Sequence, residues 1–271
     1  MSTRRPLKKL IETAGPIKRV LLLSRLRHKY ENVKPQAVVN FLDYRVRVTD
    51  GLNFYIQCKD EFILGIYHFV SDRPDPLIID GGSNIGMSIL YFKRQYPAAR
   101  IISFEPDPNV FKILQENLRS NKVTDVELIE AGLGAEAGTV GFAADNKAGG
   151  QFDPTHGDSQ IVRVERLSDY VNEPVDFLKL NIEGQELSVL QELAAAGKLR
   201  NIREMVIEYH GWADGQQLLG ELLMLLSQSG YRYLVHDFDS ETGHATKPPF
   251  KINPGVPWFC LVYARRIEQT P

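Results

Sequence analysis

Polar side chains with the chemistry to move a proton occur at the ends of two apolar, strand-like segments. Alternation along the first segment places Asn181 and Glu183 on one face, and alternation along the second does the same for Glu208 and His210. Histidine is the side chain best suited to accept a proton near neutral pH, and a neighbouring carboxylate can orient it. We therefore predict that His210, Glu208 and Glu183 form a catalytic group.

The first segment carries a further polar residue, Lys179, on the same face. A fully buried parallel strand is nearly all apolar, so several polar groups on one face need partners or a function. Glu183, Glu208 and His210 could also bind a divalent ion, but ligands scattered along the chain without compact spacing are a weak signal for a metal. We therefore predict no metal.

Residues 77–86 read LIIDGGSNIG, an apolar run that ends in Asp80 and continues into a glycine-rich turn. Such a strand-to-helix turn is where open α/β sheets bind their ligands. A dinucleotide fingerprint requires G-x-G-x-x-G, but Ser83 stands at its second glycine, and no Gly-Lys-Ser/Thr of a phosphate loop follows. The spacing D-x-G-x-x-x-G is instead similar to the first motif of Rossmann-like methyltransferases that use S-adenosylmethionine. On that resemblance, the turn residues expected to bind this cofactor are Asp80, Gly81, Gly82, Ser83, Asn84 and Gly86.

Glu105 closes the next predicted strand, 25 residues after Asp80. An acid there lies beside the turn, and its two oxygens can accept both ribose hydroxyls of an adenosine. Because NAD enzymes use an acid at the same place, Glu105 indicates adenosine rather than one particular cofactor. Asp107 is expected to cap the following helix, with Pro108 at its first position. Glu186 is interpreted as an acid favoured at a helix N-terminus.

Strand and helix patterns alternate around these residues, which predicts a parallel sheet. The expected strands are residues 77–79, 100–104, 126–129, 176–182, 204–209, 231–238 and 258–264, with extra strands at 139–142 and 160–165. The expected helices are residues 85–95, 109–120, 186–196 and 215–229. The predicted fold is α/β, with a seven-stranded, mostly parallel sheet, helices on both faces, and one antiparallel strand at or near the edge.

We expect residues 1–75 to form a small N-terminal cap and residues 76–271 to form the main domain. Alternation over residues 42–57 around an Asp-Gly pair predicts a β-hairpin, and residues 60–69 a short helix. Residues 1–35 hold ten Lys and Arg against two acids. This basic segment is interpreted as a solvated helix packed on the main domain, with weak contact to an anionic membrane surface or a phosphorylated carrier as the alternative.

The composition is that of an ordinary soluble globular protein, with 271 residues, 43% hydrophobic and 24% charged. A net charge of −2 excludes a strong overall attraction to nucleic acid. Cys58 and Cys260 lie in apolar contexts and are expected to be buried thiols. Since no apolar run is long enough to span a membrane and no signal peptide is recognisable, we expect a cytoplasmic protein.

Together these motifs resemble the FkbM family of S-adenosylmethionine-dependent O-methyltransferases, over about residues 45–235. The segments that carry the resemblance are residues 79–86, 104–106, 114–121, 166–169, 178–186 and 208–210. Two positions depart from the family pattern: Asn181 stands where the family usually has aspartate, and Ser83 stands in a turn that usually reads Asp-Val-Gly-Ala-Asn. Asn181 is therefore expected to help bind the cofactor by hydrogen bonding rather than by charge.

The resemblance implies Rossmann-like class I architecture and methyl transfer to a hydroxyl of a small molecule, such as a sugar or a natural-product scaffold. His210 would be the base, oriented by Glu208 or Glu183. The alternatives are a non-catalytic scaffold protein that keeps the nucleotide pocket, an RNA or protein methyltransferase, and an NAD-dependent oxidoreductase. The acceptor and the oligomeric state stay open; residues 144–159, residues 239–257 and the N-terminal cap are the candidate walls of the acceptor site.

Overall fold

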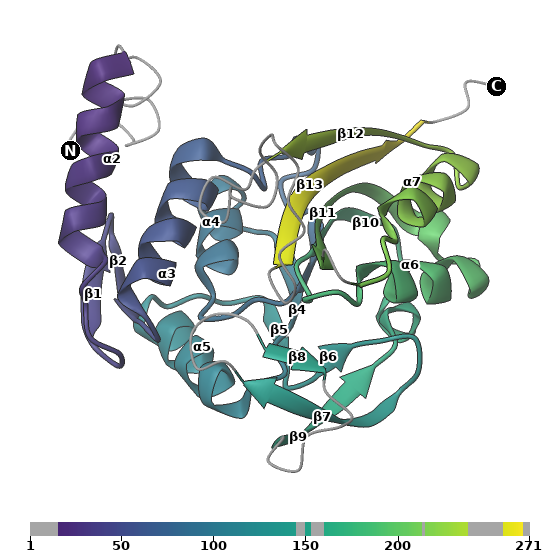
Figure 1. Ribbon diagram of the computed structural model, residues 1–271, viewed down its shortest axis with the longest axis horizontal. Coiled ribbons are helices and arrows are strands. Elements are labelled where there is room, and N and C mark those ends of the chain that lie inside the picture. The colour runs from purple at the N-terminus through teal and green to yellow at the C-terminus, as the bar shows by residue number, and fades with distance from the viewer. Residues whose placement is uncertain (1–15, 145–149, 153–159, 213–214, 238–256, 268–271) are drawn as a thin grey trace.

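A seven-stranded sheet with the order β12-β13-β11-β10-β3-β4-β5 runs through the computed structural model (Figure 1). The structure describes residues 16–144, 150–152, 160–212, 215–237 and 257–267. The strands are β3 (Leu77–Gly81), β4 (Arg100–Phe104), β5 (Val126–Ile129), β10 (Val175–Leu180), β11 (Ile202–Trp212), β12 (Tyr231–Asp237) and β13 (Pro257–Arg266). Neighbours from β11 to β5 pair in parallel, and β13 is antiparallel to both its neighbours. The predicted mostly parallel sheet is confirmed.

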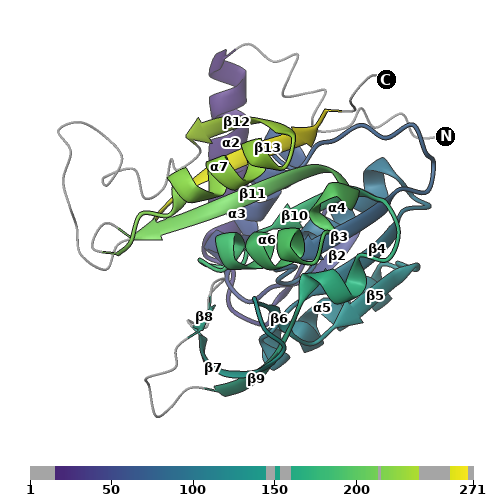
Figure 2. The same cartoon turned by 90° about the vertical axis from the view of Figure 1, so that its right-hand side faces the viewer.

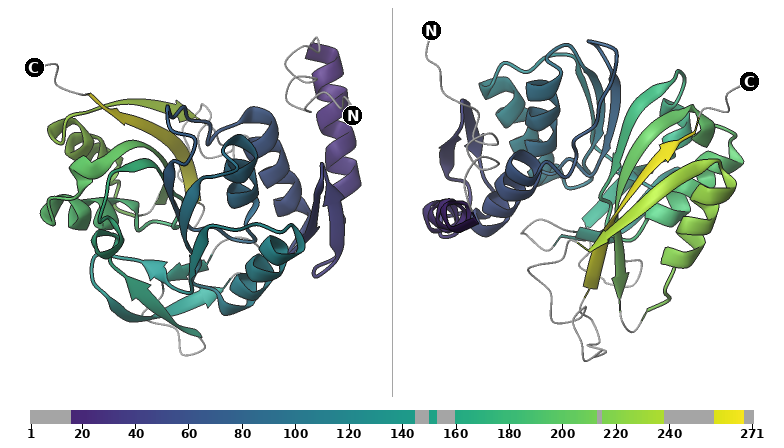
Figure 3. Two further views of the ribbon diagram at one scale, coloured as in Figure 1. Left: turned by 180° about the vertical axis from the view of Figure 1, so that it is seen from behind. Right: turned by 90° about the horizontal axis from the view of Figure 1, so that it is seen from above.

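Helices cover both faces of this sheet. The first face carries α3 (Gly51–Gln57), α4 (Met87–Gln95) and α5 (Pro108–Ser120), and the second carries α6 (Glu186–Ala195) and α7 (Leu219–Gln228), as the view from above shows (Figure 3). Because successive side chains of a strand point to opposite faces, each strand contributes to two separate cores. Ile78 and Phe177 pack in the first core, whereas Ile79 and Leu178 pack in the second.

The N-terminal region differs from the prediction in the position of its hairpin. The elements are α2 (Pro16–Tyr30), β1 (Val38–Phe41), β2 (Tyr44–Arg47), α3 and the π-helix η1 (Cys58–Leu64). The hairpin predicted over residues 42–57 is wrong, because β1 pairs with β2 and the Asp-Gly pair begins α3. Asp50 accepts a hydrogen bond from the backbone N of Asn53 at 2.8 Å, so it acts as a helix cap. Phe54 and Tyr55 are both buried, which fits one face of a helix rather than alternation along a strand.

A separate four-stranded sheet contains the two extra strands expected between the third and fourth strands of the main sheet. It consists of β6 (Gly132–Leu133), β7 (Gly138–Ala144), β8 (Gly150–Phe152) and β9 (Gln160–Glu165), in the order β6-β9-β7-β8. Figure 2, in which α6 and α7 face the viewer, shows this sheet apart from the main one. The short 3-10 helices η2 (Leu167–Tyr170) and η3 (Leu199–Asn201) complete the elements. The candidate acceptor walls at residues 144–159 and 239–257 lie largely outside the described residues.

Two further sequence predictions concern the chain as a whole. Cys58 and Cys260 are buried and form no disulfide within the described residues, as predicted. Within the described ranges, no helix has the length and apolar character required to cross a membrane.

Asn117 on α5 and Asn121, the residue that follows the end of α5, hold the hairpin against the main domain. The Asn117 side chain accepts from the backbone N of Arg47 at 2.7 Å and donates to the carbonyl oxygens of Arg47 and Ile85 at 3.0 and 2.9 Å. Asn121 makes the equivalent pair of bonds with the backbone of Arg45, both at 2.9 Å and exposed to solvent. The α5 helix thus presents amide groups to β2 much as a neighbouring strand would.

Removing the buried amide should cost more stability than removing the exposed one. We expect Asn117→Ala to lower the free energy of unfolding by about 1–3 kcal/mol, because buried backbone groups lose their partners. Asn121→Ala is the matched control and should cost less, since water can replace its bonds. Urea denaturation of both variants measures the difference, and equal losses would contradict this account of the hairpin.

Candidate functional site

One face of the main sheet changes from apolar to charged toward the carboxyl ends of three adjacent strands. Asp80 on β3, Lys179 on β10 and Glu208 on β11 lie on this face, and we call these three residues the charged face. Each follows, two positions later in its strand, a buried residue of the first core: Ile78, Phe177 and Val206, respectively. Since Lys179 pairs directly with Asp80 in the β10–β3 register, the charged groups meet at the end of the sheet that carries the glycine turn.

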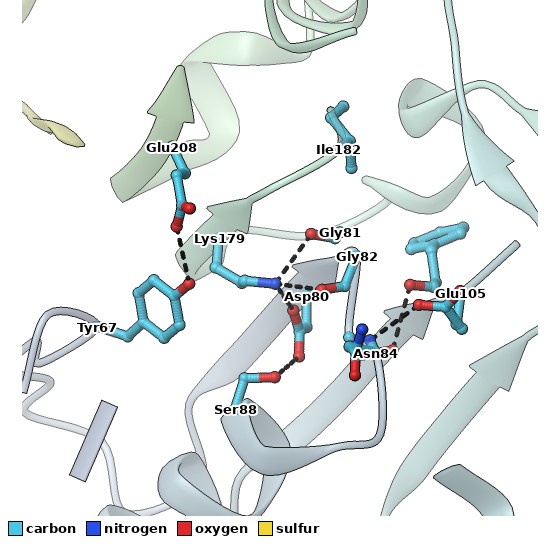
Figure 4. A network of polar contacts seen from close by, with 12 residues as sticks. Tyr67, Asp80, Gly81, Gly82, Asn84, Ser88, Glu105, Lys179, Ile182 and Glu208 are labelled. Atoms are coloured by element: carbon cyan, nitrogen blue, oxygen red, sulfur yellow. Dashed lines mark hydrogen bonds and ion pairs between the residues drawn. The ribbon is translucent and has the colours of Figure 1, made fainter. Parts of the chain in front are cut away.

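The centre of the charged face is an ion pair between Lys179 and Asp80. The lysine Nζ lies 3.0 Å from Asp80 Oδ1 and also donates to the carbonyl oxygens of Gly81, at 3.2 Å, and of Gly82 (Figure 4). The second Asp80 oxygen accepts from the Ser88 hydroxyl at 2.5 Å. Lys179 is 2% exposed and Asp80 is fully buried. Lys179 therefore fastens β10 to the turn, and Asp80 is already engaged by protein groups.

Glycine is required at two positions of the turn by the close approach of other elements. Gly82 has φ +80°, and a Cβ there would lie 1.9 Å from the carbonyl oxygen of Asn181. Gly86 has φ +90°, and a Cβ there would lie 2.6 Å from the Leu114 side chain on α5. The turn is thus pressed between the end of β10 and α5, in a backbone conformation that side chains other than glycine rarely adopt.

The remaining turn residues are tied to the end of β4. Ser83 donates from its backbone N and its hydroxyl to the carbonyl oxygen of Phe104, at 3.0 and 3.2 Å, so its side chain points into the protein. Asn84, with φ +50°, donates its backbone N to Glu105 at 2.9 Å. The turn therefore offers a ligand chiefly its backbone, and Glu105 is the acid that holds it in place.

Glu105 is buried at the carboxyl end of β4 and keeps unused acceptor capacity. One oxygen accepts from the backbone N of Asn84 and the other from that of Asp107, both at 2.9 Å. Burial raises the pKa of Glu105 to about 7, although the two backbone donors oppose the rise. Each carboxylate oxygen has a second lone pair, so the group can accept two further hydrogen bonds. Two adjacent ribose hydroxyls are donors of the required kind, which keeps the predicted role of Glu105 chemically sound. Asp107 caps α5 as predicted.

The segment after β10 folds into a tight turn that Glu186 stabilises. The strand ends at Leu180, and Glu183 and Gly184 adopt φ +55° and +100°. Glu186 Oε1 accepts from the backbone N of Ile182 at 3.2 Å and of Gly184 at 3.1 Å. Its helix-terminal position is as interpreted from the sequence, but its side chain turns back to hold the loop and to reach the next strand.

The predicted catalytic residues come together around the His210 ring. Its Nδ1 lies 3.1 Å from Glu186 Oε1, and its Nε2 lies 3.6 Å from Glu183 and 4.0 Å from Glu208. We call these four residues the histidine cluster. His210 is 7% exposed, and burial would lower its pKa, but the surrounding carboxylates outweigh burial and raise the pKa to about 10.

A ring with that pKa is an imidazolium ion at neutral pH and has no lone pair with which to accept a proton. The role of His210 as the base stays a prediction, and the raised pKa favours the protonated ring, which cannot accept a proton. Burial raises the pKa of Glu208, against the opposing effects of His210 and Lys179. Glu208 also accepts from the Tyr67 hydroxyl at 3.3 Å. Among the described residues, no group of three or more His, Cys, Asp or Glu is arranged to hold a metal ion.

Several site residues were missed by sequence reasoning. They are Glu61, Tyr67, Ser88 and, in its contact with His210, Glu186. The signal for Glu61 was the charged triplet at residues 59–61 inside an otherwise apolar stretch. No local pattern marks Tyr67 or Ser88, because their partners lie on distant strands.

The charge of His210 should be visible in the pH dependence of stability. A folded-state pKa of about 10, against 6.5 for the free side chain, gives stabilisation that is full below pH 6.5 and lost as the pH rises to about 10. We expect the stability difference between the wild type and His210→Gln to shrink across this interval. Chemical denaturation at a series of pH values measures the difference, and a constant value would contradict a charged ring.

The sequence profile of the methyltransferase FkbM domain matches residues 80–233, more than half of the chain. "Methyltransferase 1" of Beauveria bassiana is 32% identical over 162 residues, which cover 50% of this chain and 65% of that protein. The 31-O-demethyl-FK506 methyltransferase FkbM of Streptomyces tacrolimicus is 28% identical, over 60% of this chain and 75% of that protein. The 2-O-methyltransferase NoeI of Sinorhizobium fredii is 26% identical, over 57% and 72%. The chain thus spans about two thirds to three quarters of the lengths of these relatives.

Proposed function

Because the chain belongs to the FkbM family of methyltransferases, we propose that it transfers a methyl group from S-adenosylmethionine to a hydroxyl group of a small molecule. The observation that carries the proposal is the buried carboxylate of Glu105 beside the glycine turn, with acceptor capacity for a ribose. Two relatives are named for methylation on oxygen, which supports a hydroxyl acceptor. A sugar or a natural-product scaffold is the proposed acceptor class.

The residues of the site fit the cofactor in chemistry. Glu105 would accept from the ribose hydroxyls, the backbone of the turn would face the ligand, and Asn181 would add a neutral polar group. When bound, S-adenosylmethionine supplies a methyl carbon activated by a positively charged sulfur. The protein's main contribution is to align the acceptor oxygen with that carbon in a site that excludes water.

The transfer requires that the acceptor lose a proton. The acceptor oxygen forms a bond to the methyl carbon while the bond between that carbon and sulfur breaks, and the hydroxyl proton leaves to a base. We assign Glu208 as the base that accepts this proton, because an ionised carboxylate can accept a proton and a protonated His210 cannot. His210 then acts as a positioning cation for Glu208 and Glu183. The products are a methyl ether and the neutral thioether S-adenosylhomocysteine, with the proton on Glu208.

Cofactor binding tests the first part of this proposal. We expect the wild type to bind S-adenosylmethionine and S-adenosylhomocysteine, and Glu105→Gln to bind both about 10- to 100-fold more weakly, because hydrogen bonds to a charged acceptor are lost. Calorimetric titration measures the affinities. Glu116→Gln, at an exposed acid of α5, is the matched control.

Comparing two ligands that differ in one ribose hydroxyl shows whether Glu105→Gln weakens ribose binding itself or binding in general, through a distorted glycine turn. The wild type should prefer S-adenosylhomocysteine over its 2′-deoxy analogue, and Glu105→Gln should lose this preference. An unchanged preference would contradict the ribose role. A wild type that binds the cofactor but methylates no hydroxyl compound in an acceptor screen would favour the non-catalytic scaffold instead.

The proton acceptor is tested by the pH dependence of kcat. We expect kcat of the wild type to rise with pH through the raised pKa of Glu208, since only the ionised carboxylate accepts the proton. Glu208→Gln should lose this rise and about 10²- to 10⁴-fold in kcat while still binding the cofactor. If Glu208→Gln kept the rise and His210→Gln lost it, the base would be His210.

A further inference from the structure

The N-terminal region places two polar residues at the charged face, outside residues 80–233, which the family profile matches. Tyr67 bonds to Glu208, and its ring centre lies 5.6 Å from Lys179 Nζ. The π-helix η1, which ends at Gly65 with φ +68°, brings Glu61 to the same place. Short π-helical segments are rare and occur frequently at functional sites.

Glu61 is a buried acid with an unsatisfied oxygen. It is 7% exposed, and its Oε2 has no hydrogen-bond partner among the residues that the structure describes. Its carboxyl group interacts electrostatically with Lys179, Asp80 and Glu208, which locates it at the charged face. A buried polar atom without a partner is costly to the folded state, so such an atom indicates a missing ligand.

The other groups that could receive a positive charge at the turn are already occupied by the protein. Lys179 contacts Asp80 Oδ1 and the carbonyl oxygens of Gly81 and Gly82, and Ser88 occupies Asp80 Oδ2. Both oxygens of Asp80 thus already contact a protein group, so the ammonium group at the amino-acid end of the cofactor would share them with Lys179 and Ser88. Glu61 is the neighbouring acid that keeps an oxygen available.

We propose that Glu61 binds the ammonium group at the amino-acid end of S-adenosylmethionine. The assignment rests on the proposed function and adds to it a binding residue from the N-terminal region. With this assignment, the N-terminal region supplies a side chain that contacts the ligand.

The surroundings of Glu61 link this binding to the release of a proton. Burial raises the pKa of Glu61 well above its usual range, and nearby acids add to the rise while Lys179 opposes it. The titratable groups that face Glu61 are Cys58, Asp60, Tyr67, Asp80, Tyr91, Lys179 and Glu208. The raised pKa favours the protonated form of Glu61 without a ligand, and the arrival of an ammonium group favours the ionised form.

Calorimetric titration of the full chain tests the assignment with three ligands. S-adenosylmethionine carries sulfonium and ammonium groups, S-adenosylhomocysteine carries only the ammonium, and 5′-methylthioadenosine carries neither. We expect Glu61→Gln to bind the first two about 10- to 100-fold more weakly, because a bond between charged groups is lost, and to bind the third like the wild type. Asp43→Asn, at an exposed acid of the same region, should bind all three like the wild type.

Proton release provides a second readout that a purely structural role would not change. At pH 6.5 the ligand's amino group, with a pKa of about 7.7–8, is already charged. Titration in buffers of different protonation enthalpy should show that the wild type releases more protons with S-adenosylmethionine than with 5′-methylthioadenosine. Glu105 faces the ribose of both ligands, so its contribution cancels. Glu61→Gln should abolish the difference and Glu208→Gln should keep it. A wild type that shows no difference would overturn the assignment even if Glu61→Gln does not fold.

Each other outcome has a distinct meaning. Equal weakening for all three ligands, or unchanged binding, would overturn the assignment of Glu61. Weakening for S-adenosylmethionine alone would place Glu61 at the sulfonium and overturn the ammonium assignment. A wild type that binds none of the three would contradict the proposed function itself.

Discussion

The site depends on the buried ion pair between Lys179 and Asp80. A buried pair contributes little net stability by itself, since desolvation offsets much of the attraction, but breaking one leaves an uncompensated charge and costs about 3–5 kcal/mol. Here the lysine also holds the carbonyl oxygens of Gly81 and Gly82, so one ammonium group ties the start of the glycine turn to β10, which already pairs with β3. The close contact between Gly82 and the Asn181 carbonyl follows from that arrangement.

Acids outnumber bases around this centre, and Glu208 connects its two parts. The basic side chains are Lys179 of the charged face and His210 of the histidine cluster. The acidic side chains around them are Asp80, Glu208, Glu183, Glu186 and Glu61. Buried charges are tolerated when they are paired, so an excess of buried acids leaves room for a positively charged ligand. This excess of acids is the electrostatic feature that supports the proposed binding of a positively charged ligand.

The sequence was most informative where the local pattern and the tertiary structure agree. The strands at residues 100–104 and 126–129 were predicted to the residue, because apolar runs between turn residues have few alternatives. The hairpin predicted over residues 42–57 was misplaced, because a short alternation of apolar and polar residues is compatible both with a strand and with one face of a helix. The raised pKa of His210 could not be predicted. It depends on burial, on Glu183 and on Glu186, and Glu186 approaches only because the loop after β10 folds back.

The hydrogen bond between Tyr67 and Glu208 joins residues separated by 141 positions in the chain. Contacts between such distant residues form late, because the entropy of closing so long a loop must first be overcome. The early part of the chain leaves the ribosome before the strand that it must contact exists. The lysine that holds the glycine turn is itself 98 positions from Gly81, so the turn and the complete binding site are both late products of folding.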